Sequence, residues 1–193
     1  IMKIAGVYSS HDCAFAILED GIPTVHAELE RYLRVKEPVG DAFNFLKQEY
    51  QDYNDIKYFS HTIDTYKGGP MAWYPESWQN MIDLSSANGG KVLMPGHHKS
   101  HAANAFFSSN CNDALIITLD GGGRDIKNGT VIPTAFTVWE GNKNKISEIA
   151  ILHEHEVNIG IYWAEFTEKV FGLSRGYPKG NQCGTVMAMA CMG

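Results

Sequence analysis

Three histidines occur within five residues, between His97 and His101, and a small-residue apolar stretch follows them. His97 and His101 are four residues apart, so on a helix their imidazoles share one face and could bind one divalent ion, while His98 would point elsewhere. A third ligand would have to come from another segment, and two imidazoles with a carboxylate suit iron(II), manganese or zinc. The alternative is a helix start at which the histidines cap the helix, pair with acids or face solvent.

An aspartate followed by three glycines ends the next apolar stretch. Asp120 could hold a magnesium ion or orient a hydroxyl group. A turn formed by Gly121, Gly122 and Gly123 would expose backbone N–H groups to a phosphate, as nucleotide sites do. A plain β-turn, with glycine present for its positive φ, is the alternative.

A polar turn of Ser9, Ser10, His11 and Asp12 separates two apolar stretches near the N-terminus. His11 could act as a general base near neutral pH, because imidazole titrates in that range, and Asp12 could orient it. A polar hairpin turn without chemistry would have the same residues.

The segment "ELERYLRVK" mixes acids and bases densely. Glu30, Arg31 and Lys36 are its candidate binding residues, because Arg and Lys could grip a phosphate or a carboxylate. The same charges would also suit a solvated face.

Composition restricts the class of protein. The chain has 193 residues, of which 44% are hydrophobic and 20% are charged, which is typical of a globular protein. The net charge of -6 argues against a nucleic-acid binder. No apolar run has the roughly 18 residues that a membrane helix needs. Four separated cysteines and an N-terminal stretch unlike a secretory leader lead us to expect a cytoplasmic protein.

The apolar pattern indicates the elements that must position these groups. Three strands with a turn at Asp20 and Gly21 would form a β-meander. The order then continues as α/β with a mixed sheet, and it starts over after residue 90. We therefore expect a first lobe at 1–90, and at 91–193 the start of a second, incomplete lobe that carries the metal and nucleotide motifs. The expected strands lie near 2–9, 13–20, 22–30, 56–62, 91–95 and 113–120 and in a hairpin at 134–156, and the expected helices near 41–50, 74–87, 100–109 and 161–172.

Five motifs, taken in order, resemble the N-terminal half of the carbamoyltransferases that modify nodulation factors and antibiotics. The resemblance implies transfer of a carbamoyl group from carbamoyl phosphate to an acceptor hydroxyl, through a carbamoyl-adenylate made with ATP. It also implies the ribonuclease H-like fold of actin, sugar kinases and heat-shock ATPases. The motifs are "GVYSSHDCAFAILEDG", "ELERYLRVK", "HHKSHAANAFFSS", "LDGGG" and "NIGIYWAEFTEKVFG".

The same resemblance implies roles for the candidate residues. His97 and His101 would hold a divalent metal, expected to be Fe(II), at the nucleotide phosphates, with Mg²⁺ as an alternative ion. Asp120 and the three glycines after it would line the adenylate site. His11 would be the general base at the acceptor hydroxyl, and the segment with Glu30 would belong to the substrate site.

The chain departs from the family pattern near its end. The family has E-G-K-x-M-G-L-A-x-Y-G where this sequence reads "CGTVMAMACMG", so Cys183 and Thr185 replace an acid and a lysine. Family members are also longer, and activity would require a second chain that carries the missing half. The alternative is a non-catalytic remnant or binding subunit, and a hydrolase acting on a nucleotide or carbamoyl phosphate is a third hypothesis.

Overall fold

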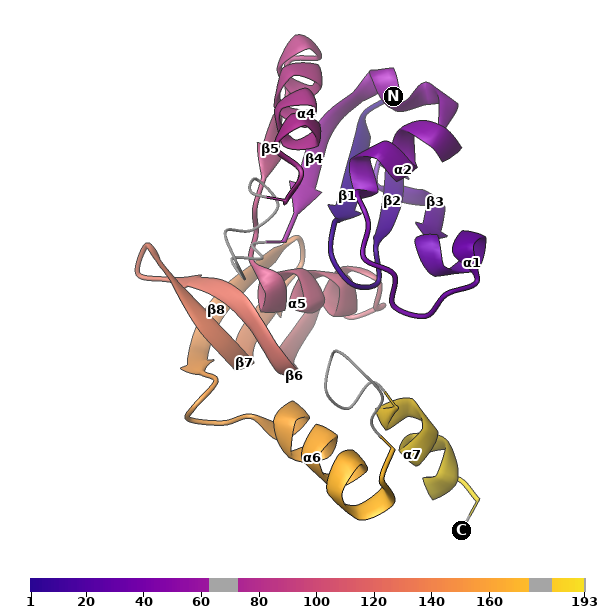
Figure 1. The fold of residues 1–193 in the computed structure, drawn as a ribbon. Helices are drawn as coiled ribbons and strands as arrows, with labels where there is room; N and C mark the ends of the chain where they lie inside the picture. The colour runs from indigo at the N-terminus through magenta and orange to yellow at the C-terminus, as the bar shows by residue number, and fades with distance from the viewer. Residues whose placement is uncertain (63–72, 174–181, 193) are drawn as a thin grey trace. The chain divides into compact units, whose positions relative to one another are not determined.

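The computed structural model describes residues 1–62, 73–173 and 182–192 (Figure 1). The chain divides into two compact units, Ile1–Gly96 and His97–Gly193. In the described residues, no helix combines the length and the apolar character needed to cross a membrane. The first unit contains β1 Lys3–Tyr8, β2 Ala14–Glu19, β3 Ile22–Glu28, α1 Leu29–Leu33, α2 Ala42–Glu49, the 3-10 helix η1 Gln51–Asp55, β4 Ile56–His61, α4 Pro75–Ala87 and β5 Lys91–Leu93.

The sheet of the first unit has the strand order β3-β2-β1-β4-β5. β2 runs antiparallel to β1 and β3, whereas β4 is parallel to β1 and β5 is parallel to β4. The predicted turn between β2 and β3 is present, and both Asp20 and Gly21 have the positive φ that a tight hairpin turn requires. A five-stranded sheet in this order, with only the second strand reversed, is the arrangement of the ribonuclease H-like fold shared by actin. The predicted fold class is therefore confirmed.

The core of the first unit lies between this sheet and the helices α2 and α4 (Figure 1). Alternate residues of β1 and β2 are buried, which is the pattern of strands with one face against the core. Pro75 opens α4, where its missing N–H costs no helix hydrogen bond. The largest fully buried apolar side chains here are Phe15, Phe59, Ile17, Leu46, Ile56 and Met81.

The second unit is built on one antiparallel sheet, in the order β6-β7-β8. The helix α5 packs against β6 and β7, and Ala102, Phe106, Ile116, Trp139 and Ile151 form the core between them. The elements are α5 His97–Phe107, β6 Asp113–Lys127, β7 Thr130–Asn142, β8 Lys145–His153, α6 Ile159–Phe171 and α7 Cys183–Ala190.

Two predictions about the elements differ from the structure. β5 pairs with β4, so the segment after residue 90 belongs to the first unit and the division lies at Gly96. The predicted glycine turn does not form, because Gly121–Gly123 continue strand β6 as a β-bulge between Leu119 and Gly123. None of these three glycines has a positive φ. Three residues of β6 face one residue of β7 there, which bends the strand.

Candidate metal centre

Two elements of the second unit position three metal-ligand side chains. His97 and His101 lie in the first two turns of α5, on one face as their spacing predicts, and Asp120 lies in the β-bulge of β6, just before the three glycines. Both helix and strand belong to the same core, so the three side chains are held by packed elements. Among the described residues, the side chains of His97, His101 and Asp120 lie close enough together to hold one metal ion.

The three ligand atoms form a small triangle. His97 Nε2 lies 2.7 Å from Asp120 Oδ2, His101 Nε2 lies 3.4 Å from the same oxygen, and the two Nε2 atoms are 3.1 Å apart. Metal–ligand bonds of about 2.0–2.2 Å separate neighbouring donors by roughly 3–3.5 Å. The 3.1 and 3.4 Å sides lie in this range, and the 2.7 Å side, a hydrogen bond between His97 and Asp120, is somewhat shorter. The triangle could therefore form one face of the coordination shell of a single ion and leave other positions open.

The electrostatics of the triangle favour ionised aspartate. Burial opposes ionisation of Asp120, but hydrogen bonds from His101, His97 and the Gly121 N–H outweigh it and hold the pKa of this carboxyl far below its usual range. The hydrogen bond to Asp120 correspondingly raises the pKa of His101. A carboxylate facing two imidazoles is the charge state that a divalent cation would stabilise further.

His98 points away from this triangle, as predicted, and lies in the core. Its Nδ1 lies 2.8 Å from Thr118 Oγ1, and its Nε2 lies 3.2 Å from the Thr134 carbonyl oxygen. The chain of hydroxyl groups continues from Thr118 to Thr137, which accepts a hydrogen bond from Trp139 Nε1. Burial lowers the pKa of His98, so it is a neutral structural residue that donates from Nε2 to the carbonyl group.

Two glycines beside Asp120, Gly123 and Gly160, have a packing role. A Cβ at Gly123 would lie 2.5 Å from the imidazole ring of His97, and a Cβ at Gly160 would lie 2.3 Å from the backbone N of Gly121. Gly123 thus lets His97 approach β6, and Gly160 lets α6 begin beside the bulge. These contacts explain the glycines by close approach, and the predicted role of Gly121–Gly123 in nucleotide binding stays a prediction.

His11 and Asp12 meet in the first unit. His11 Nδ1 lies 2.7 Å from Asp12 Oδ2, although neighbouring side chains of a strand point to opposite faces. Asp12 has a φ of 58°, in the left-handed region, and this turn geometry brings the two side chains together. The pair has the predicted orientation of an imidazole held by a carboxylate, and its catalytic role stays a prediction.

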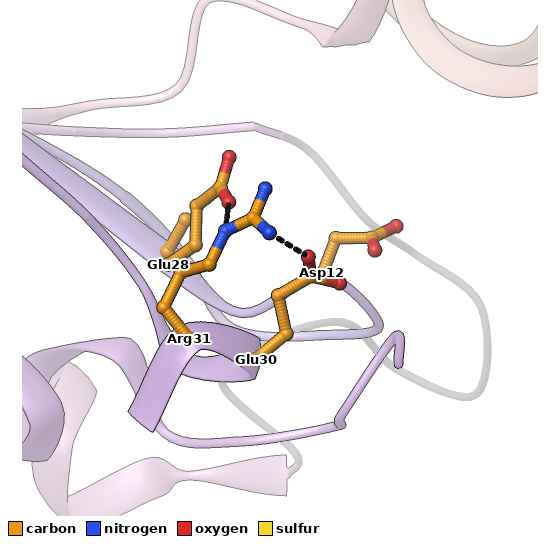
Figure 2. A pocket seen from close by; sticks show the side chains of 5 residues that line it. Asp12, Glu28, Glu30 and Arg31 are labelled. Atoms are coloured by element: carbon orange, nitrogen blue, oxygen red, sulfur yellow. Dashed lines mark hydrogen bonds and ion pairs between the residues drawn. The ribbon is translucent and has the colours of Figure 1, made fainter. Parts of the chain in front are cut away.

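The charged segment lies next to this pair and forms a pocket of about 230 Å³ lined by Asp12, Ala14, Glu28, Glu30 and Arg31. Figure 2 shows Arg31 between two carboxylates, with its Nε 2.9 Å from Glu28 and its Nη1 3.3 Å from Glu30. Three acids and one base line the pocket, so its local charge is negative.

A second base of the segment, Lys36, is paired with Glu30 at 2.9 Å, and the ammonium group lowers the pKa of that carboxyl. Arg31 and Lys36 are thus already paired with acids. This pairing disfavours the predicted grip of Arg31 and Lys36 on a phosphate, and it favours a cationic or hydroxyl-rich ligand in the pocket. Substrate binding by these residues stays a prediction.

Two residues near the metal centre were missed by sequence reasoning. Asp125 accepts hydrogen bonds from the backbone N–H groups of His98 and Lys99, at the start of α5. Asn158 caps α6 by accepting from the Ile161 N–H and donates to the Gly121 carbonyl oxygen. The signal available for Asn158 was its place before a helix pattern, whereas Asp125 caps a helix distant in sequence and offers no local signal.

Comparison with known proteins gives weak similarities. No protein-family model matches the chain. The chain is 24% identical over 204 residues to an uncharacterized protein of Synechocystis sp., covering 86% of this chain and 31% of that protein. It therefore spans about a third of the length of the curated relative that it matches.

Two solved structures from Pseudomonas aeruginosa are similar to the chain at 11% sequence identity. One is an uncharacterized protein with similarity to the peptidase YeaZ, with a TM-score of 0.46 over 82% of this chain and 70% of that chain. The other is YeaZ, with a TM-score of 0.44 over 81% and 72% of the respective chains.

The predicted membership of the carbamoyltransferase family is corrected by these findings. No protein-family model matches the chain, and the two solved structures reported above are YeaZ and a YeaZ-like protein. The five motifs are short and rich in Gly, His and charged residues, so their order alone did not determine the family. What stands is the fold, which rests on the strand order of the first sheet.

Proposed function

We propose that this chain is a metal-dependent binding subunit, which holds a divalent cation at His97, His101 and Asp120 and through it the phosphate groups of a nucleotide such as ATP. The observation that carries the proposal is the triangle of ligand atoms, with sides of 2.7, 3.1 and 3.4 Å. Two imidazoles and one carboxylate on one side of an ion suit Fe(II), Mn²⁺ or Zn²⁺, and Mg²⁺ would fit this nitrogen-rich set less well.

Phosphate is the ligand that such a centre would take. An ion held by three protein ligands keeps open coordination positions, and phosphate oxygens can fill them. The proteins of the actin class bind ATP, which supports a nucleotide as the source of the phosphate by analogy of fold. The chain's own part would be to hold the ion and its ligand in place.

A further polypeptide is the partner that the second unit would take. In the first unit, β4 pairs in parallel with the outer edge of β1. In the second unit, β6 pairs only with β7 among residues 97–173 and 182–192. Leu115 and Ile117 of β6 are 66% and 54% exposed, which is unusual for side chains of this size in a strand.

The partner we propose is a second chain that adds a strand parallel to β6 and covers these apolar side chains. Such a partner would make this chain a binding subunit and not a complete enzyme.

The test is an anaerobic titration of the full chain with Fe²⁺ and with Mn²⁺, in the presence and absence of ATP. We expect one ion per chain, tighter binding when ATP is present, and loss of binding in His97→Ala. His26→Ala is the matched control, because His26 is an exposed histidine of the other unit. Absence of binding for both ions, with and without ATP, would overturn the proposal, as would equal binding by the His97 and His26 variants.

A further inference from the structure

We propose that Asp125 is a positioning residue of the metal centre, which sets the place of α5 so that His97 and His101 face Asp120. The proposal rests on the proposed metal-binding function and adds to it a residue that touches neither the ion nor its ligands' side chains. It assigns a purpose to the most deeply buried carboxylate of the second unit's described residues, at 1% exposure.

Asp125 is held by three donors. Its Oδ2 accepts from the His98 N–H at 3.1 Å and from Thr134 Oγ1 at 2.6 Å, and its Oδ1 accepts from the Lys99 N–H at 3.2 Å. A buried carboxylate is costly unless such donors replace water, so this arrangement tolerates little displacement. The two amide donors immediately follow His97, so the carboxylate fixes the backbone at the metal ligand itself.

The side chain that caps α5 belongs to another element, strand β6. The residue before α5 is Gly96, which has no side chain to accept from the first-turn N–H groups. A local cap would stabilise the helix without fixing its place on the sheet. A cap from β6 does both, because Asp125 ties the start of α5 to the strand that also carries Asp120.

The two aspartates thus act on the same turn of α5 from the same strand. Asp120 meets the imidazole of His97, and Asp125 meets the backbone of His98 and Lys99. Gly123, between the aspartates, leaves the room that the His97 ring occupies. Loss of the Asp125 contact would free the first turn of the helix, and the two imidazoles would lose their fixed distance from the carboxylate.

The test compares metal affinity in wild type, Asp125→Ala and Asp125→Asn, with Mn²⁺ for affinity and Co²⁺ as a spectroscopic probe. We expect a loss of about 10–100-fold in affinity for Asp125→Ala, the range seen for residues that orient metal ligands. Asp125→Asn keeps one oxygen acceptor and should lose less. The visible absorption bands of bound Co²⁺ should change in shape, because they report the arrangement of the ligands.

The control Ile151→Val lowers stability in the same core without touching the helix start, and it should leave affinity and the Co²⁺ bands unchanged. If Asp125→Ala does not fold, Thr134→Val decides, since it removes only the 2.6 Å hydrogen bond and should weaken binding by a smaller factor. Wild-type affinity in whichever of these two variants folds overturns the positioning role alone. A wild-type chain that binds no metal overturns the proposed function and this inference with it.

Discussion

The imidazole of His97 lies against a backbone position that has no side chain. A Cβ at Gly123 would be 2.5 Å from the ring, closer than any real contact of this kind. We expect Gly123→Ala to push His97 away from Asp120 and to weaken metal binding about tenfold or more, as other changes in ligand orientation do. A titration with Mn²⁺, monitored by calorimetry, measures this effect.

Gly122→Ala is the matched control for that experiment. The nearest atom to a Cβ at Gly122 is Glu154 Oε2 at 3.8 Å, which is ordinary contact, and neither glycine has a positive φ. The alanine should therefore be tolerated there and leave affinity unchanged. Equal losses in both variants would mean that the bulge tolerates no side chain at all, and the specific contact with His97 would then be wrong as the explanation.

At the scale of single residues, the sequence could predict the candidate metal ligands but not the residues that position them. The four-residue spacing of His97 and His101 predicted a shared helix face, because helix geometry is local. Asp120, which completes the triangle, was singled out as a possible magnesium ligand and as part of the adenylate site, but not as the third ligand beside the two histidines. Asp125 could not be found, because its donors lie 26 and 27 residues away in sequence and only the tertiary fold brings them together.

Cysteine reactivity should also follow burial. Burial raises the pKa of the Cys13 thiol to about 12, with a smaller contribution from the charge of Asp41, so near pH 8 it is a buried, protonated thiol. Cys111 and Cys191 are exposed. We expect iodoacetamide to modify these two within the native protein and Cys13 only after unfolding, as peptide mass spectrometry would show. Labelling of native Cys13 at the rate of Cys111 would contradict the buried placement.

At the scale of elements, Asp41 caps the start of α2. Asp41 accepts from the N–H groups of Phe43 and Asn44 and from the buried hydroxyl group of Ser77 on α4. Asp41→Ala should lower the free energy of unfolding by about 2 kcal/mol, from loss of the cap and an unsatisfied buried donor. Urea unfolding measures this change.

Gln48→Ala serves as the control for the α2 experiment, because Gln48 is exposed on the same helix and should change stability by less than about 0.5 kcal/mol. If Asp41→Ala proved no more costly than this control, the cap and the contact with Ser77 would contribute nothing to stability.

Elements with a clear period were predictable, and those defined by distant pairing were not. The meander, α2 and the hairpin of β7 and β8 follow from alternation, a capping aspartate and turn residues, all of which act locally. The bulge at Gly121–Gly123 was predicted as a turn, because a glycine triplet serves both structures. The unit to which β5 belongs depends on its pairing with β4, which its three residues do not encode.

At the scale of the molecule, the two units share a meander but differ at its outer edge. The first has two parallel strands beyond β1, whereas the second has none beyond β6 among its described residues. The helix α6 of the second unit also exposes apolar side chains. Thr167 is its buried residue, while Tyr162 and Val170 are largely exposed. An apolar helix with so little buried surface supports the partner that we propose for the second unit.

Two adjacent isoleucines of β6 provide a test of that conclusion. Ile116 is 6% exposed and packs under α5, while Ile117 is 54% exposed on the opposite face. Ile116→Thr should lower the free energy of unfolding by about 2 kcal/mol or more, because it removes apolar contacts and buries a hydroxyl group.

Ile117→Thr keeps a β-branched residue in the strand and should lower the free energy of unfolding by less than about 0.5 kcal/mol. It should also reduce binding of an apolar dye, because it removes part of the exposed patch. Urea unfolding measures the change in stability, and dye fluorescence measures the change in dye binding. An equally large loss of stability in the two variants would mean that the outer face of β6 is already covered within this chain. No partner would then be needed to cover it.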